Sequence, residues 1–126
     1  MAYTATVTLK RIAPRSLLVT ITETEADATG EAEITGLPEA LRLVEQRGLF
    51  VSGAGSTIDP ILGLVTNPSG DNLIIENGGA AASVVNRPSG GTPIAPIAGS
   101  LFHRSVLDSA SDNVTTIKYL FVIGWE

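Results

Sequence analysis

The chain has 126 residues, one His, one Trp, no Cys and a formal net charge of −5, with a pI near 4.7. This length is that of a single domain, and 44% hydrophobic against 17% charged residues excludes a disordered acidic tail. The lack of Cys excludes disulfides and thiolate metal sites, and the acidic balance argues against a nucleic-acid binder, which needs clustered Lys and Arg.

No segment predicts export or membrane insertion. Residues 2–9 alternate polar and apolar, whereas a secretory signal needs a continuous apolar stretch. The longest apolar run, 119–125, is far shorter than the roughly 20 residues that cross a bilayer. We therefore expect a soluble protein that has no export signal and no membrane partner.

The first part of the chain predicts two paired strands. Residues 3–11 alternate apolar and polar side chains, which is the period of a half-buried strand, and their threonines suit a pleated surface. After Pro14 the alternation resumes over 16–24, so the two runs predict an antiparallel pair. The expected inward side chains of the second run are Leu17, Val19 and Ile21.

A turn is expected at 27–30, and a third strand follows it and ends at 36–38. Alternation in this third strand places Ala32 and Ile34 inward and Glu31 and Glu33 outward.

Residues 38–47 are ambiguous. Pro38 followed by a glutamate favours a short helix, because both suit the first helical turn. The Leu41/Leu43 alternation favours a strand with an irregularity at Gly48, and the neighbouring β segments make this the preferred prediction.

The rest of the chain predicts short strands separated by turns. The expected strands are 61–66, 73–76, 82–85, 100–107 and 115–125, with turns at 67–70, 77–79 and 108–113 and a Gly/Pro-rich loop or arm at 87–99. Asn77-Gly78 between two apolar runs is a hairpin signal, and Tyr119, Phe121 and Trp125 share one face of the last strand and are expected in the core. The whole pattern predicts an all-β, single-domain β-sandwich or jelly roll over 1–126, with at most one short helix.

The charges are unevenly distributed along the chain. Seven acidic residues fall between Glu23 and Glu45, whereas residues 48–102 hold four charges, at Asp59, Asp71, Glu76 and Arg87. One explanation is a surface of small Gly, Ser, Thr and Asn residues that stays soluble without charge. The other is that another subunit covers this surface, since interface centres are depleted in charge. We favour a subunit contact, with 87–99 reaching a neighbouring subunit. The candidate interface residues are Leu49, Val51, Ile58, Ile61, Leu62, Leu64, Pro93, Ile94, Pro96 and Ile97.

No motif predicts catalysis, a cofactor or a metal ion. The chain has no Gly-x-Ser-x-Gly motif that would supply a nucleophilic serine for His103, so His103 is expected to be structural or on the surface. A single His also cannot supply a zinc site. The i, i+2 pairs Glu23/Glu25 and Glu31/Glu33 are interpreted as solvated strand faces and not as glycosidase carboxylates. Asp108 and Asp112 are interpreted as turn formers, because no calcium-loop pattern surrounds them.

Two further motifs carry no prediction of function. Gly53-x-Gly55 lacks the rest of a dinucleotide fingerprint, and the sequon at Asn113 matters only on an exported chain.

The sequence resembles the small structural proteins of tailed bacteriophages. The resemblance is carried by the Met-Ala-Tyr-Thr start, the threonine-alternating opening strands, the run at 21–26, the loop at 55–63 and the Tyr-Leu-Phe-Val-Ile-Gly-Trp-Glu end. It implies a non-enzymatic capsid decoration (cement) protein, made in the host cytoplasm, located in the virion and set over gaps between capsid subunits. The implied partners are the major capsid protein or other virion proteins and further copies of the chain, with a trimer favoured. No functional residue carries over.

Three alternatives remain open at this point. A phage tail or connector component would share the same features. A carbohydrate-binding β-sandwich would show exposed aromatic residues in a groove and would be retained on a glycan column. A small hydrolase would place His103 in a pocket, and His103→Ala would then remove its activity.

Overall fold

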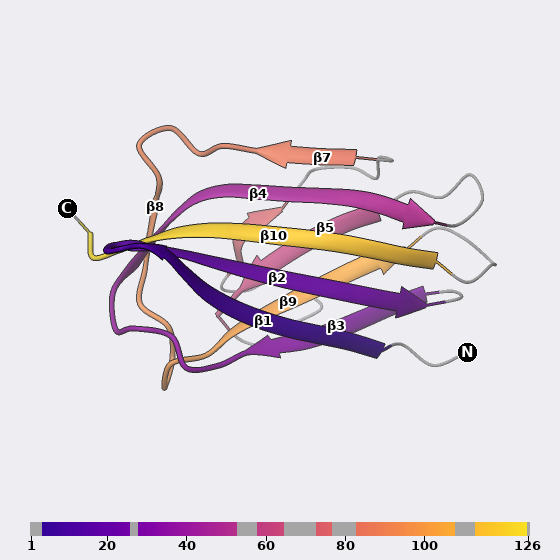
Figure 1. Cartoon of the computed structure of the whole chain (residues 1–126), viewed down its shortest axis with the longest axis horizontal. Helices are drawn as coiled ribbons and strands as arrows, with labels where there is room; N and C mark the ends of the chain where they lie inside the picture. The colour runs from indigo at the N-terminus through magenta and orange to yellow at the C-terminus, as the bar shows by residue number, and fades with distance from the viewer. Residues whose placement is uncertain are drawn as a thin grey trace.

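A computed structural model describes residues 4–25, 28–52, 58–64, 73–76, 83–107 and 113–125. These residues form strands, turns and loops but no helix, and the strands make two antiparallel sheets (Figure 1). The expected all-β, sandwich-like fold is confirmed. No helix able to cross a membrane occurs in the described part of the chain.

The wider sheet holds six strands. They are β1 (Thr4–Ala13), β2 (Ser16–Glu25), β4 (Leu41–Ser52), β7 (Ser83–Asn86), β8 (Thr92–Ile94) and β10 (Asn113–Ile123). Their order is β1-β2-β10-β4, and β7 and β8 pair with different parts of the far edge of β4. The predicted pairing of the first two strands is confirmed, with Val7 opposite Ile21.

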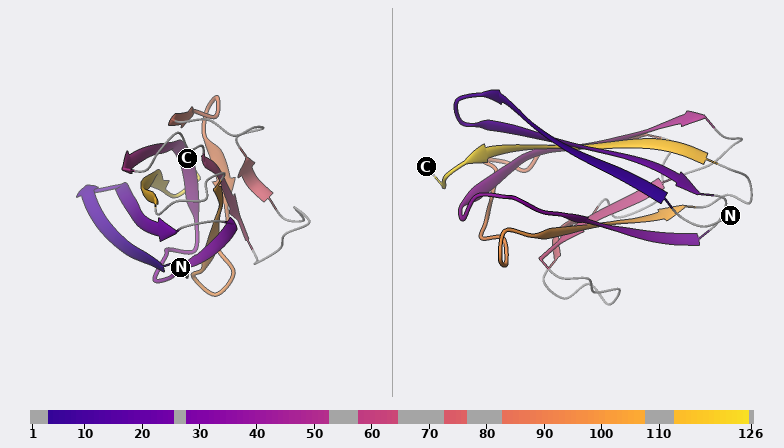
Figure 2. Two further views of the ribbon diagram at one scale, coloured as in Figure 1. Left: turned by 90° about the vertical axis from the view of Figure 1, so that its right-hand side faces the viewer. Right: turned by 60° about the horizontal axis from the view of Figure 1, so that its bottom comes forward.

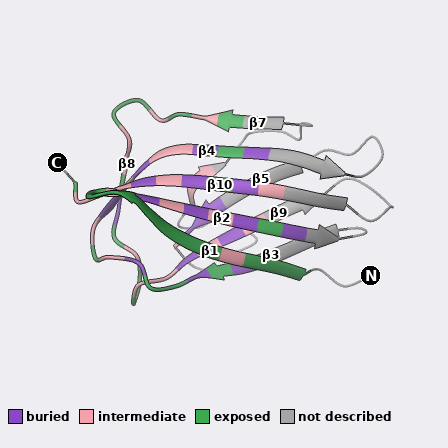
Figure 3. Cartoon of the chain, viewed as in Figure 1, coloured by how far each residue is buried: buried purple, intermediate pink, exposed green. Residues whose placement is uncertain are grey.

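The narrower sheet holds four strands in the order β3-β9-β5-β6. They are β3 (Ala28–Ile34), β5 (Ile58–Gly63), β6 (Leu73–Glu76) and β9 (Leu101–Leu107). The core lies between the two sheets, where alternate residues of their strands meet (Figure 3). Its buried apolar side chains are Leu17, Val19, Ile21, Ala32, Ile34, Leu37, Leu41, Leu43, Leu62, Ile94, Leu101, Ile117, Tyr119 and Phe121.

β1 does not have the expected buried face. Its side chains are exposed on both faces apart from the half-buried Val7, and Leu9 and Ile12 are 37% and 50% exposed (Figure 3). The reason is its position: β1 is the edge strand of the six-stranded sheet, and it touches the four-stranded sheet mainly at β3. The period-two pattern correctly predicts a strand here, but it does not predict burial.

The ambiguous segment is a strand, as preferred, but its irregularities do not lie at Gly48. Gly48 pairs in register with Ile117, whereas the pairing of β4 with β10 skips Val44 and Val51. A bulge reverses which residues point inward. The bulge at Val44 therefore allows both Leu43 and Gln46 to be buried while Glu45 points outward.

Two predicted turns are corrected by the topology, and a third loses its last residue to a strand. Residues 28–30 belong to β3 and not to a turn. The strands on either side of Asn77-Gly78 lie in different sheets, because β6 pairs with β5 and β7 pairs with β4, so they form no hairpin. Of the turn expected at 108–113, residues 108–112 lie outside the described residues, and Asn113 is the first residue of β10.

Much of segment 87–99 packs onto the chain itself. It contains β8, whose Ile94 is 3% exposed and pairs with Leu41. The arm alternative therefore does not hold for β8. Trp125 lies beyond the end of β10 and is 54% exposed, so it is not in the core as expected, although its Nε1 donates a hydrogen bond to the Ile94 carbonyl at 2.9 Å.

Gly91, just before β8, has φ +77°, a conformation that L side chains rarely adopt. A Cβ at this position would lie 2.5 Å from Arg42 Cγ, so the glycine lets the loop approach β4 closely.

Candidate functional site

The single histidine is at the centre of a buried polar network. His103 on β9 is 0% exposed, and its Nε2 lies 2.8 Å from Glu23 Oε1 on β2. Its Nδ1 lies 2.6 Å from the Tyr119 hydroxyl on β10. Glu23 and Tyr119 are also fully buried. Because β9 belongs to the narrower sheet and β2 and β10 to the wider one, the imidazole joins the two sheets.

The network continues across three adjacent strands of the wider sheet. Tyr119 and Gln46 are cross-strand partners, as are Gln46 and Asn86. Gln46 Nε2 donates to the Tyr119 hydroxyl at 3.1 Å, and Asn86 Nδ2 donates to Gln46 Oε1 at 2.7 Å. We call Glu23, His103, Tyr119, Gln46 and Asn86 the buried polar network; it runs from the core to the half-buried Asn86.

One arrangement of protons satisfies these four hydrogen bonds. Burial raises the pKa of Tyr119 far above its usual value, so the phenol keeps its proton. The hydroxyl accepts from Gln46 and donates its own proton to His103 Nδ1. The imidazole then carries its proton on Nε2 and donates it to Glu23. All four hydrogen bonds thus point toward the carboxylate, which is how such bonds reinforce one another.

Carboxylate, imidazole and hydroxyl occur in the same order in hydrolytic triads. A triad works only when its hydroxyl can reach a substrate, and here Tyr119, His103 and Glu23 are all 0% exposed. The raised pKa of Tyr119 also opposes formation of a nucleophilic phenolate. The arrangement therefore serves to hold the sheets together and satisfies polar groups that would otherwise be costly to bury.

The interpretation of Glu23 as a solvated carboxylate is wrong. Glu23 continues the inward series of β2 and is buried against His103. Glu31 and Glu33 are exposed as expected, and Ser100 Oγ donates to Glu33 at 2.8 Å. Among the described residues, no three His, Asp or Glu side chains gather as a metal site would require.

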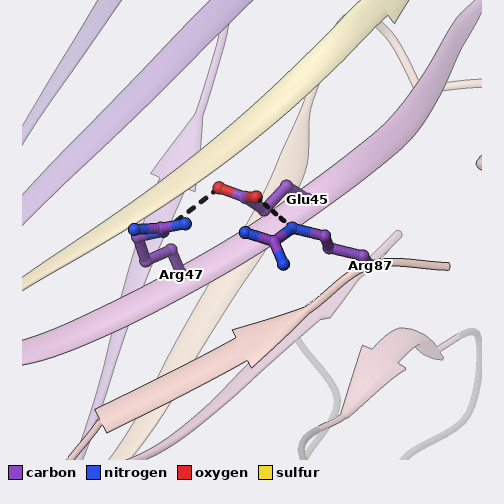
Figure 4. A network of polar contacts seen from close by, with 3 residues as sticks. All are labelled: Glu45, Arg47 and Arg87. Atoms are coloured by element: carbon purple, nitrogen blue, oxygen red, sulfur yellow. Dashed lines mark hydrogen bonds and ion pairs between the residues drawn. The ribbon is translucent and has the colours of Figure 1, made fainter.

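A second polar cluster lies on the outer face of the wider sheet. Glu45 on β4 pairs with Arg47 two residues later at 3.2 Å and with Arg87 after β7 at 2.7 Å (Figure 4). The hydrogen bond from Arg87, assisted by Arg47, lowers the pKa of Glu45. Arg87 of this cluster directly follows Asn86 in the chain, so the cluster lies next to the half-buried end of the buried polar network.

The ten candidate interface residues fall into three groups. Leu62 and Ile94 are core residues, so their side chains cannot contact a partner. Leu64 and Pro96 are half-buried, and Pro93 and Ile97 are exposed. The side chains of Leu49, Val51, Ile58 and Ile61 lie outside the described part of the structure, although their backbones belong to β4 and β5. The subunit contact stays a prediction.

The remaining motifs singled out from the sequence lie outside the described residues or lack described side chains. They are Gly53, Gly55, Asp108 and Asp112 in the first case and Glu25 and Asn113 in the second.

Sequence reasoning missed Gln46 and the polar role of Tyr119. A signal for Glu23 and His103 was present, because each occupies an alternate position in an inward-facing apolar series. No such signal existed for Gln46, because the bulge at Val44 decides that it points inward. Comparisons with protein-family models and with curated protein sequences find no match.

Proposed function

We propose that this chain is a non-enzymatic structural subunit of a tailed-bacteriophage virion, of the decoration type that binds between capsid subunits. Two findings and the sequence resemblance support the proposal. The first finding is that Glu23, His103 and Tyr119, which could carry acid–base chemistry, are fully buried and hydrogen-bonded to one another. The second is that the edge strand β1 is exposed. Stabilising a capsid requires contact area and a rigid body, and it requires no reaction.

The observation that carries the proposal is the exposure of β1 on both faces. A ten-residue edge strand offers a row of backbone groups for pairing, and proteins usually blunt or cover such an edge. Figure 2 shows β1, in indigo, at the edge of the wider sheet. Leu9 and Ile12 on this strand add exposed apolar side chains that do not belong to the core cluster. Burial of these side chains against a neighbouring protein would stabilise the contact.

Rigidity of the body is the second requirement. The buried polar network ties β9 of one sheet to β2 and β10 of the other. Its hydrogen bonds are directional, so they fix how the sheets are placed relative to one another. A cement-type subunit that must hold neighbours at a set spacing would benefit from this fixed geometry.

The test is co-sedimentation of an epitope-tagged chain with particles from the lysate in which it is made. We expect the tag to sediment with complete particles and with tailless heads. A tag that sediments with isolated tails but not with heads would instead favour the tail or connector alternative. A tag that stays in the supernatant would contradict a virion role. The matched variant Leu9→Ser/Ile12→Ser should reduce recovery with heads, whereas Thr6→Ser on the same strand should not.

A further inference from the structure

The outer face of the six-stranded sheet gathers cations, although the chain as a whole is acidic. We call this surface the basic face, and it carries Lys10, Arg42, Arg47, Arg87 and Lys118 with Glu45 as its one described carboxylate. The strand registers place Lys118 directly opposite Arg47. The row of Lys10 runs through Leu18 and Leu120 to Glu45 and holds no second cation. In a protein of net charge −5, this is a marked local reversal.

Two of these cations are placed against each other. Lys118 and Arg47 are direct cross-strand partners on the basic face, and both are exposed. Like charges at directly opposed positions destabilise a sheet. Glu45 is shared by Arg47 and Arg87, so one carboxylate faces three cations here, which are Arg47, Arg87 and Lys118. An anionic partner seated on the face would relieve this repulsion.

The opposite side of the molecule presents carboxylates. Glu31 and Glu33 are exposed on the outer face of β3, the edge strand of the narrower sheet, and we call this edge the acidic edge. Arg104 is the cross-strand partner of Glu31 and is half-buried, and Glu33 is opposite Phe102. The two glutamates are two residues apart on one strand, which spaces them by roughly 7 Å. Lys118 and Arg47 lie on adjacent strands, whose backbones are about 4.8 Å apart, so each of these cations can pair with one glutamate.

We propose that the basic face of one copy binds the acidic edge of a second copy of this chain. The two surfaces differ and lie on different sheets, so the contact is heterologous: each copy uses one surface of each kind. Repetition of such a contact closes into a ring or extends as a filament, depending on the rotation between neighbours. The inference rests on the proposed role as an assembly subunit and names its partner.

The sharpest test mixes two variants in analytical ultracentrifugation at low salt. Lys118→Glu damages the basic face and leaves the acidic edge intact, whereas Glu31→Gln/Glu33→Gln does the reverse. We expect the wild-type chain to self-associate and each variant alone to do so about tenfold more weakly, a change of about 1.4 kcal/mol. A mixture of the two variants should form a 1:1 dimer that grows no further, because only one good pair of surfaces remains.

Controls separate this contact from general charge effects and from misfolding. Arg11→Glu changes the net charge equally on the same sheet, but Arg11 is opposite the inward-facing Leu17, so its association should match wild type. Lys118→Glu places a carboxylate opposite Arg47, so its thermal midpoint should equal or exceed that of wild type. Raising the salt concentration should weaken wild-type association, because exposed charges are screened.

Several outcomes would overturn the inference. They are a monomeric wild-type chain at all concentrations, a mixture that forms no dimer, and an equal loss of association in Arg11→Glu. Binding of duplex DNA to the basic face without self-association would assign that face to a polyanion instead. None of these depends on particle binding, so failure here is distinguishable from failure of the virion role.

Discussion

His103 Nε2 lies 2.8 Å from Glu23 Oε1, and this contact joins the two sheets through side chains that are both fully buried. Removing one member of such a pair leaves the other group buried without its partner, which costs about 3–5 kcal/mol. We therefore expect His103→Ala to lower the free energy of unfolding in urea by about this amount. Glu23→Gln, which keeps an acceptor for Nε2, should cost less. The exposed Glu31→Gln, as control, should stay within about 0.5 kcal/mol of wild type. Equal stability of His103→Ala and Glu31→Gln would contradict the structural role.

The burial of His103 predicts that its imidazole does not react with reagents while the chain is folded. Diethyl pyrocarbonate modifies accessible imidazoles, and His103 is 0% exposed. Mass spectrometry should find His103 unmodified in native buffer and modified in denaturant. Rapid modification of the native chain would show an accessible imidazole and would reopen the hydrolase alternative.

The burial of Tyr119 predicts that the folded chain loses stability at high pH. Its folded pKa is raised above the usual 10.0 by burial, so the unfolded phenol ionises first as the pH rises. The stability linked to Tyr119 is therefore fully present below pH 10 and falls by about 1.4 kcal/mol for each further unit. Urea unfolding of wild type and Tyr119→Phe between pH 9 and about 11 measures the difference. Parallel pH dependence in the two proteins would show that Tyr119 does not contribute.

We expect Glu45 to contribute a smaller change in stability, at low pH. The Arg87 hydrogen bond, with help from Arg47, lowers its folded pKa below 4.5, so its contribution is present above that pH and is lost as the pH falls. The pair is at the surface, so the contribution should be below about 1 kcal/mol. The stability difference between wild type and Arg87→Gln should shrink from pH 6 to 3. A difference that does not change over this range would refute the assignment.

The sequence predicts strands well because alternation is a local property. β2, β3 and β9 show it clearly, and the preference for a strand over a helix at 38–47 is correct. Whether an alternating strand is covered is not local. β1 alternates like β2 but is exposed on both faces apart from Val7, because it is the edge strand and touches the narrower sheet mainly at β3.

Pairing partners and bulges depend on tertiary contacts and were less predictable. Asn77-Gly78 has the composition of a hairpin turn, yet the strands around it lie in different sheets. Glu23 and His103 are 80 residues apart in the chain, so no local pattern links them. Gln46 joins the network only because the bulge at Val44 points it inward. Alternation could therefore indicate that Glu23 and His103 point inward, but not that they meet each other or that Gln46 joins them.

The most direct test of the central claim is an image of the particle. A gold-labelled tag on this chain, combined with electron cryomicroscopy of purified virions, locates the subunit on the particle. A decoration role predicts labels at regular positions on the head lattice, between capsid subunits. Intact particles that contain no label, from cells in which the tagged chain is made and folded, would contradict it.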